Sequence, residues 1–307
     1  MVDFGAVLRR LPSRDEVLGS LDQIAVAREA ARPFVPGESV GSAVQAVAET
    51  MAAGMGASVL YLPVPEAQEV TSLVSMQVID ALAADDLSMG TDLAVSPRAL
   101  GLGRAGPDRV RTGVGGLCRA AASAGMTVTL TSVPHELVGD LLALRAAVAE
   151  EFPDLGVTLT ANLHRTEADC LDLAGRSARV RLMRREDVEA PGVAFADGHE
   201  IDKAYVRCTR MLMDGGARPV LATGDARLVE IAGALAERAD RDPSDYVYQF
   251  RRGVLDARAA ELVAAGASVS ILVPFGPGWA AYIARWIAVR PTSLGRAVGA
   301  ALGRSDS

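Results

Sequence analysis

The sequence has few of the residues from which metal centres, disulfide frameworks and nucleic-acid surfaces are built. Its three cysteines lie far apart and form no C-x-x-C pair, and its three histidines form no H-x-x-x-H pair. These absences argue against a zinc site, a disulfide framework and metal catalysis. The net charge is −7, no basic run occurs, and Lys203 is the one lysine in the chain. Because phosphate neutralisation needs clustered Lys and Arg, we expect no nucleic-acid partner.

The sequence also lacks a long uninterrupted apolar run. Its first residues, MVDFGAVLRRLPSRDE, carry charges where a signal peptide needs an apolar segment. The most apolar window, residues 269–289, is broken by Pro274 and Gly276 and carries Arg285. It therefore predicts a buried strand followed by a helix, with no transmembrane segment. We expect a cytoplasmic protein. One predicted helix carries an apolar stripe formed by Trp279, Tyr282, Ile283, Trp286 and Ile287. Such a stripe usually packs into the protein core, and a peripheral membrane contact is the alternative.

What the sequence has is a regular alternation of short apolar runs with longer Ala- and Leu-rich segments of helical spacing. Strands that alternate with helices form right-handed βαβ units and a parallel sheet. Eight such units in about 250 residues predict a (β/α)8 barrel. A doubly wound open sheet is the alternative, but no Gly-rich turn follows the first run, which ends in LPVPEAQ. The eight runs are residues 57–64, 91–96, 126–133, 156–162, 178–184, 218–223, 245–250 and 267–273.

Two helical stretches precede the first run. One begins at SRDE, residues 13–16, which resembles a capping box, and the other covers residues 39–51. We expect residues 1–54 to form a helical segment packed on the closed bottom or the flank of the barrel. Residues 55–307 then form the barrel itself.

Ligands of such barrels bind at the carboxyl ends of the strands, and the sequence places polar residues there. Arg179 and Arg181 alternate with apolar residues and point to one face of their strand. If that face is the interior, an internal salt bridge and a bound anion are equally consistent with it. Thr223 and Asp225 precede a helix, where a helix cap is a more frequent role than phosphate binding. The helix in VPFGPGWAAYIARWIAVRP, residues 273–291, presents Tyr282, Arg285, Trp286 and Val289 on one face, which looks like half of a binding site.

Six segments, in order and at barrel spacing, resemble the FAD-dependent proline dehydrogenase family between about Arg32 and Leu294. RPFVPGE is similar to the family's RFVAGE, and GVTLTANLHRTEADCLDL to its fourth strand with LxRTExDL. ARVRLMR resembles RVRLVKGAY, VLATGDARL resembles AIATHDxRL, and YVYQFRRGV resembles FEFQMLYGV. The stretch from residue 273 resembles VPYGxxWxPYxxRRLAERP.

The resemblance implies oxidation of L-proline or a related cyclic amine by hydride transfer to FAD, with electrons passing to a membrane quinone or another acceptor. The family clamps the substrate carboxylate with a lysine on the second strand and an Arg-Arg pair on the last helix, and a tyrosine covers the ring. By this resemblance Tyr282 matches the tyrosine and Arg285 the first arginine. On the cofactor side, Arg181 matches a strand arginine of the family and Arg184 stands where the family has a phosphate-facing lysine. Thr223 and Gln249 are the same residues as in the family pattern.

Other family positions are changed. Trp286 replaces the second clamp arginine, Ser96 aligns with the clamp lysine, and Leu272 replaces a tyrosine. On the cofactor side Gly224 replaces a histidine and Thr160 a glutamine. Losing two of three clamp cations removes about 3–6 kcal/mol of binding free energy, on the order of 10²–10⁴ in affinity for proline. Two readings therefore stay open: a flavoenzyme with an altered substrate, and a catalytically inactive homologue that acts as a scaffold or regulatory binding protein.

Overall fold

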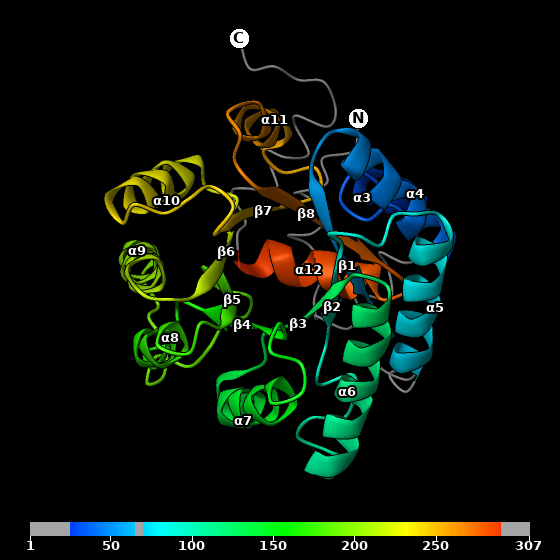
Figure 1. Cartoon of the computed structure of the whole chain (residues 1–307), viewed down its shortest axis with the longest axis horizontal. Helices are drawn as coiled ribbons and strands as arrows, with labels where there is room; N and C mark the ends of the chain where they lie inside the picture. Colours follow the sequence, from blue (N-terminus) through cyan, green and yellow to red (C-terminus); the bar gives the residue numbers. More distant parts are fainter. Residues whose placement is uncertain (1–24, 65–69, 290–307) are drawn as a thin grey trace.

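The computed structural model describes residues 25–64 and 70–289. Within these residues, eight parallel strands form a closed barrel in which each strand pairs with its neighbours along the chain and β8 pairs with β1 (Figure 1). The predicted (β/α)8 fold is confirmed, and each predicted run overlaps one strand. The strands are β1 (Gly56–Tyr61), β2 (Asp92–Val95), β3 (Thr127–Leu130), β4 (Gly156–Thr160), β5 (Arg179–Met183), β6 (Arg218–Ala222), β7 (Val247–Arg251) and β8 (Val269–Phe275).

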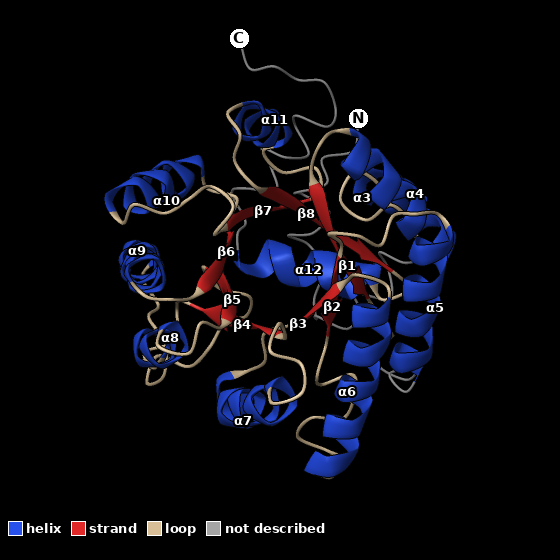
Figure 2. Cartoon of the chain, in the orientation of Figure 1, coloured by secondary structure: helices blue, strands red, loops and turns tan. Residues whose placement is uncertain are grey.

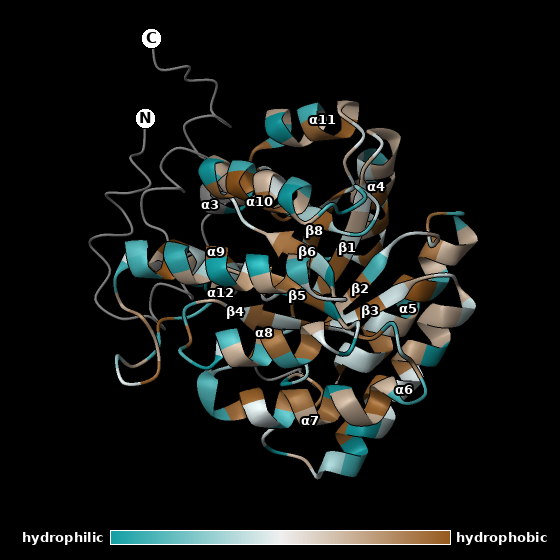
Figure 3. Cartoon of the chain, turned by 60° about the vertical axis from the view of Figure 1, so that its left-hand side comes forward, coloured by the Kyte–Doolittle hydropathy of each residue, from teal (hydrophilic) through white to brown (hydrophobic). Residues whose placement is uncertain are grey.

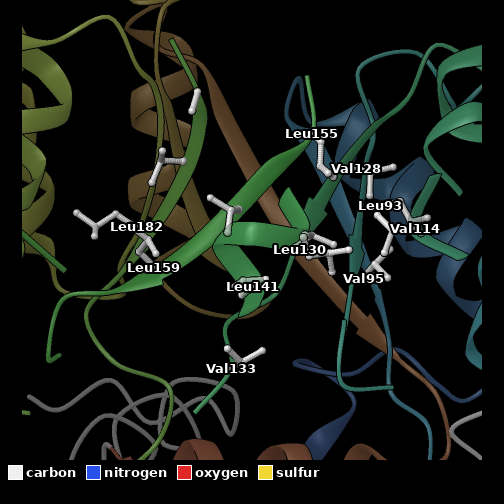
Figure 4. Close-up of a cluster of buried hydrophobic side chains, with 14 of the residues drawn as sticks. Leu93, Val95, Val114, Val128, Leu130, Val133, Leu141, Leu155, Leu159 and Leu182 are labelled. Atoms are coloured by element: carbon white, nitrogen blue, oxygen red, sulfur yellow. The ribbon is translucent and has the colours of Figure 1, made fainter. Parts of the chain in front are cut away.

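The side chains of each strand alternate between the barrel interior and the helices outside. Leu93 and Val95 on β2, with Val128 and Leu130 on β3, are buried in the layer between strands and helices (Figure 4). The residues that alternate with them, such as Asp92, face the interior. The strands are therefore buried on both faces, which is why they read in the sequence as nearly continuous apolar runs.

A ring of helices surrounds the barrel (Figure 2). Hydrophilic and hydrophobic residues alternate along α9 and α10 (Figure 3), so each turns one side to the strands and the other outward. The helices of the ring are α4 (Val40–Ala52), α5 (Thr71–Ala84), α6 (Pro107–Ser123), α7 (Val138–Ala149), α8 (Thr166–Ala174), α9 (Gly198–Asp214), α10 (Ala226–Arg238) and α11 (Asp256–Ala264).

Helix α4 comes before the barrel in the sequence but lies on its flank. It contacts β1, β8 and α5, and it begins where Ser39 caps it by accepting a hydrogen bond from the Ser42 amide at 3.2 Å. The helix expected over residues 39–51 is thus present. The shorter α3 (Ala25–Ala31) precedes it, and the helix expected from residue 13 lies outside the described residues.

Helix α12 (Trp279–Val289) follows β8 but leaves the ring and crosses the barrel opening, where Figure 1 shows it near the centre of the view. It is held there by an apolar cluster formed by its own residues with α3 and the segment after β1. Trp279, Tyr282, Ile283 and Trp286 are each at most 6% exposed and pack with Phe34 and Leu62. The apolar stripe therefore packs into the protein core. No helix in residues 25–64 and 70–289 is long and apolar enough to cross a membrane.

Candidate functional site

The amino end of the barrel interior is closed by an ion pair. Arg179 donates from Nη1 to Asp92 Oδ1 at 2.6 Å, and Ser58 and Thr129 donate to the same carboxylate at 2.7 and 2.8 Å. Burial alone would raise the pKa of Asp92, but the charge of Arg179 and the Ser58 hydrogen bond outweigh it and lower that pKa. For Arg179 the structure thus gives the internal salt bridge that the spacing allowed.

Arg181 lies one layer nearer the carboxyl ends of the strands and has spare hydrogen-bonding capacity. Its Nε donates to Thr158 Oγ1 at 2.8 Å, whereas its buried Nη1 has no hydrogen-bond partner. The residue is 3% exposed, and burial lowers the pKa of Arg181 to about 10 while the charges of Asp92 and Glu186 oppose that shift. A buried donor without a partner is costly, so Arg181 is suited to meet a ligand acceptor.

Two cavities meet at Arg181 beneath α12. The larger has a volume of about 240 Å³ and the smaller about 60 Å³. They share four lining residues, Arg181, Met183, Arg251 and Leu272. Both therefore lie at the carboxyl ends of the strands, where ligands of this fold bind.

The residues matched to the carboxylate clamp gather on the larger cavity. Ser96, Leu272, Tyr282 and Arg285 all line it. Trp286, which was grouped with them, lines the smaller cavity instead. Its ring packs edge-on against Phe34, with centroids 5.2 Å apart. The side chain of Val289 lies outside the described part of the structure.

Most of the residues matched to the cofactor gather on the smaller cavity. It is lined by Arg181, Arg184, Thr223, Gly224 and Gln249. Thr160 lines neither cavity; its carbonyl oxygen accepts a hydrogen bond from the Thr166 hydroxyl at 2.7 Å.

The cations on the α10 side of this cavity already have protein partners. Arg184 forms an ion pair with Asp202 and donates to the Gly198 carbonyl at 2.7 Å, and Arg227 also pairs with Asp202 at 2.7 Å. Asp225 caps α10 by accepting from the Arg227 amide at 3.0 Å. The helix-cap reading of this segment is thus the one observed.

The structure brings Arg251 and Glu186 to the site, two charged residues that lie in strand-end stretches expected to face a ligand but were not singled out from the sequence. Arg251 Nη2 donates to Glu186 Oε2 at 2.7 Å, and its Nη1 donates to the Tyr282 hydroxyl at 2.5 Å. The same guanidinium lies 5.3 Å from the ring centroid of Tyr282 and 5.7 Å from that of Trp286. A signal was present, because Arg251 follows the matched Gln249 by two residues and so shares its strand face.

Glu186 stays ionised because it lies among arginines. Burial would raise the pKa of Glu186, but the charges of Arg251 and Arg285 outweigh it and lower the pKa. Arg285 approaches from the other side, with its Nε 3.9 Å from Glu186 Oε1. Burial raises the pKa of Tyr282, although Arg251 opposes this, so its hydroxyl keeps its proton at neutral pH. The larger cavity therefore combines the Glu186 carboxylate with four guanidinium groups, those of Arg98, Arg181, Arg251 and Arg285.

Among the described residues, one group of side chains that line neither cavity brings metal-ligand atoms together. The donor atoms of His135, Glu136 and Glu189 lie within 4.8 Å of one another. Glu189 already accepts hydrogen bonds from the backbone amide and from Nδ1 of His135, at 3.1 and 3.0 Å, so it serves to hold two loops together.

The fold and site define a (β/α)8 barrel with a cationic binding site at its carboxyl end. A structure of proline utilization A from Bdellovibrio bacteriovorus superposes on 98% of the chain with a TM-score of 0.80 and 18% identity, although the chain spans only 38% of that protein. A second, from Corynebacterium freiburgense, gives a TM-score of 0.71 over 93% of the chain and 34% of its own length, at 15% identity. At these sequence identities, the structural similarities show a shared fold and nothing more.

Sequence similarity goes further. The chain is 25% identical to proline dehydrogenase 1 of Bacillus subtilis over 87% of its own length and 88% of the relative. It is 26% identical to proline dehydrogenase of Deinococcus radiodurans over 85% of its length and 86% of that protein. No protein-family model matches the chain. The resemblance to proline dehydrogenases that the six segments predicted is confirmed.

Proposed function

We propose that the protein is an FAD-dependent oxidoreductase of the proline dehydrogenase type, which oxidises L-proline or a related cyclic amine at its CH–NH bond. The observation that carries the proposal is the pair of cavities that meet at Arg181. The matched substrate residues Tyr282 and Arg285 lie on one, and the matched cofactor residues Thr223 and Gln249 lie on the other. This division would allow a substrate and a redox cofactor to lie side by side.

The donor set of the smaller cavity fits the ring system of a flavin. Arg181 has an unpaired buried nitrogen, and Gln249, which is 3% exposed, adds an amide beside it. The oxygens and nitrogens of a flavin ring would accept hydrogen bonds from such groups. FAD would supply the acceptor for the hydride that leaves the amine carbon.

The residues of the chain bind, orient and shield the amine. Tyr282 presents its ring to the larger cavity, while Arg251 fixes the position of its hydroxyl. Arg285 offers a guanidinium at the same face of α12. Helix α12 covers the opening through buried Trp279 and Ile283, and exclusion of water by this helix would strengthen the electrostatic interactions inside. The electron acceptor would be a quinone or another oxidant.

The second candidate is an inactive homologue that acts as a scaffold or regulatory binding protein. Two observations favour it. Arg184, matched to a phosphate-facing lysine, is engaged by Asp202, and the smaller cavity measures only about 60 Å³.

Under either proposal, the chain divides into a helical segment, residues 1–54, and the barrel, residues 55–307. A cytoplasmic location is part of both proposals.

The visible absorption spectrum separates the two candidates. Purified protein is measured directly and again after incubation with excess FAD and gel filtration. If the protein is the proposed enzyme, we expect the absorption bands of bound oxidised flavin, and we expect a cyclic amine to bleach them under anaerobic conditions. Protein that retains no FAD would support the inactive homologue and end the enzyme proposal.

A further inference from the structure

The Glu186 carboxylate lies between two guanidinium groups at the wall of the larger cavity. Its Oε2 accepts from Arg251 at 2.7 Å, and its Oε1 faces Arg285 at 3.9 Å. The Glu186 and Arg251 side chains are 16% and 18% exposed, so solvent screens this pair only weakly. Each carboxylate oxygen thus faces one arginine.

This arrangement is the one that a ligand carboxylate would adopt. Guanidinium groups recognise carboxylates through charge-assisted, directional hydrogen bonds, and they are the natural partners for any carboxylate that enters the cavity. Here the chain supplies the carboxylate itself. A ligand carboxylate must either displace Glu186 or lie beside it, and like charges in a half-buried site repel each other.

We infer that Glu186 determines the substrate specificity of the site: it occupies the carboxylate position between Arg251 and Arg285 and selects cyclic amines that carry no carboxylate. The inference rests on the proposed function for the reaction, but the binding preference itself needs no flavin. Tyr282 supports it, because the Arg251 hydrogen bond keeps the tyrosine ring on the cavity wall, where it can pack against an apolar ring.

Three small molecules distinguish binding of the ring amine from binding of the carboxylate. Pyrrolidine carries the ring amine without a carboxylate, cyclopentanecarboxylate carries the carboxylate without the amine, and L-proline carries both. Titration calorimetry of the wild-type protein, as purified and with added FAD, gives the dissociation constant of each. We expect pyrrolidine to bind at least about tenfold more tightly than either carboxylate, a difference of about 1.4 kcal/mol.

Glu186→Gln tests the cause of this preference. The amide keeps the shape of the side chain and removes its charge, so both arginines become available to a ligand. We expect cyclopentanecarboxylate and L-proline to bind about tenfold or more tightly than in the wild type. Asp154→Asn is the matched control, because it removes the same charge from a side chain that is 65% exposed and lines neither cavity. It should alter carboxylate affinity by less than about threefold.

The outcomes are distinct. If Glu186→Gln and Asp154→Asn strengthen carboxylate binding equally, overall charge governs the site and the inference is overturned. It is also overturned if the wild type binds carboxylates as tightly as pyrrolidine, or binds no pyrrolidine. That comparison needs no variant, so it holds even if Glu186→Gln misfolds. If the protein prefers pyrrolidine to both carboxylates but retains no FAD, the proposed oxidation is overturned and the inference on Glu186 stands.

Discussion

Arg179 Nη1 lies 2.6 Å from Asp92 Oδ1 inside the barrel, and the two side chains are 16% and 5% exposed. The residues begin β5 and β2, so the pair lies at the amino end of the barrel, away from the cavities beneath α12. Their charges are satisfied by each other and by neighbouring hydroxyl groups. The pair is therefore expected to act on stability and to leave ligand binding unaffected.

Asp92→Asn should lower the free energy of unfolding by about 3–5 kcal/mol, because it leaves Arg179, whose side chain is only 16% exposed, without a counter-ion. Urea denaturation followed by circular dichroism measures the change. Asp154→Asn is the control, since Asp154 pairs with Arg218 at the same 2.6 Å but with side chains 65% and 48% exposed. Its loss should cost less than about 1 kcal/mol. Equal losses in the two variants would show that the barrel pair has no special role.

The same carboxylate predicts a pH dependence of stability. The pKa of Asp92 is lowered in the folded protein, because the charge of Arg179 and the Ser58 hydrogen bond outweigh the effect of burial. Its contribution is therefore fully present above the unfolded-state pKa, about 3.9, and is lost as pH falls through the lower folded-state pKa. Unfolding free energies measured from about pH 6 to pH 2 should fall more steeply for wild type than for Asp92→Asn. Parallel curves would contradict this assignment.

The fold could be predicted because its signal is periodic and local. Apolar runs mark strands that are buried on both faces, and their number fixes a closed barrel. The path of α12 could not be read in this way. Its stripe of Trp279, Tyr282, Ile283 and Trp286 has ordinary amphipathic spacing, which says that it is buried but not against what. Only the cluster with Phe34 and Leu62 places it over the opening.

The site could be predicted where a residue occupies a matched position on a strand or helix. Thr223, Gln249, Tyr282 and Arg285 line the cavities as their positions suggested. Glu186 was not singled out in this way, because it occupies no matched position and its partner cannot be read from its own loop. Loop side chains meet their partners through tertiary geometry, and Arg251 is 65 residues further along the chain. Trp286 was grouped with the clamp because it matches the second clamp arginine, and a matched position does not show which of two adjacent cavities the side chain faces.

Arg181→Met tests the proposed contact with FAD. The substitution keeps the buried stem and removes the guanidinium, including the Nη1 that has no partner in the protein. Loss of charged hydrogen bonds worth about 1.5–3 kcal/mol should weaken FAD binding by about 10- to 150-fold, measured by quenching of flavin fluorescence. Arg145→Met is the control, because Arg145 is also buried at 7% exposure and is bonded to the Leu155 carbonyl, outside both cavities. Equal losses in both variants would mean that Arg181 acts through stability alone.

Trp286→Arg restores the second arginine of the matched pattern, but Arg251 already lies 5.7 Å from the Trp286 ring. The variant loses the packing on Phe34 and places two guanidinium groups together in a buried site. We expect it to lose about 3–5 kcal/mol of unfolding free energy. Arg251→Leu should relieve the repulsion, so the double variant should be more stable than the sum of the single changes predicts, by about 1 kcal/mol or more.

A double-mutant cycle in urea measures this coupling. Trp279→Arg provides the matched cycle, because Trp279 is the other tryptophan of the same helix and is 3% exposed, with Arg28 over its ring at 5.9 Å. Combined with Arg251→Leu it should be additive within about 0.5 kcal/mol. Additivity in the Trp286 cycle would show that Arg251 does not occupy the space of a second clamp arginine. Non-additivity in the Trp286 cycle alone would support the expected outcome. It would mean that Arg251, at the end of β7, occupies the space that the second clamp arginine of the last helix occupies in the family pattern.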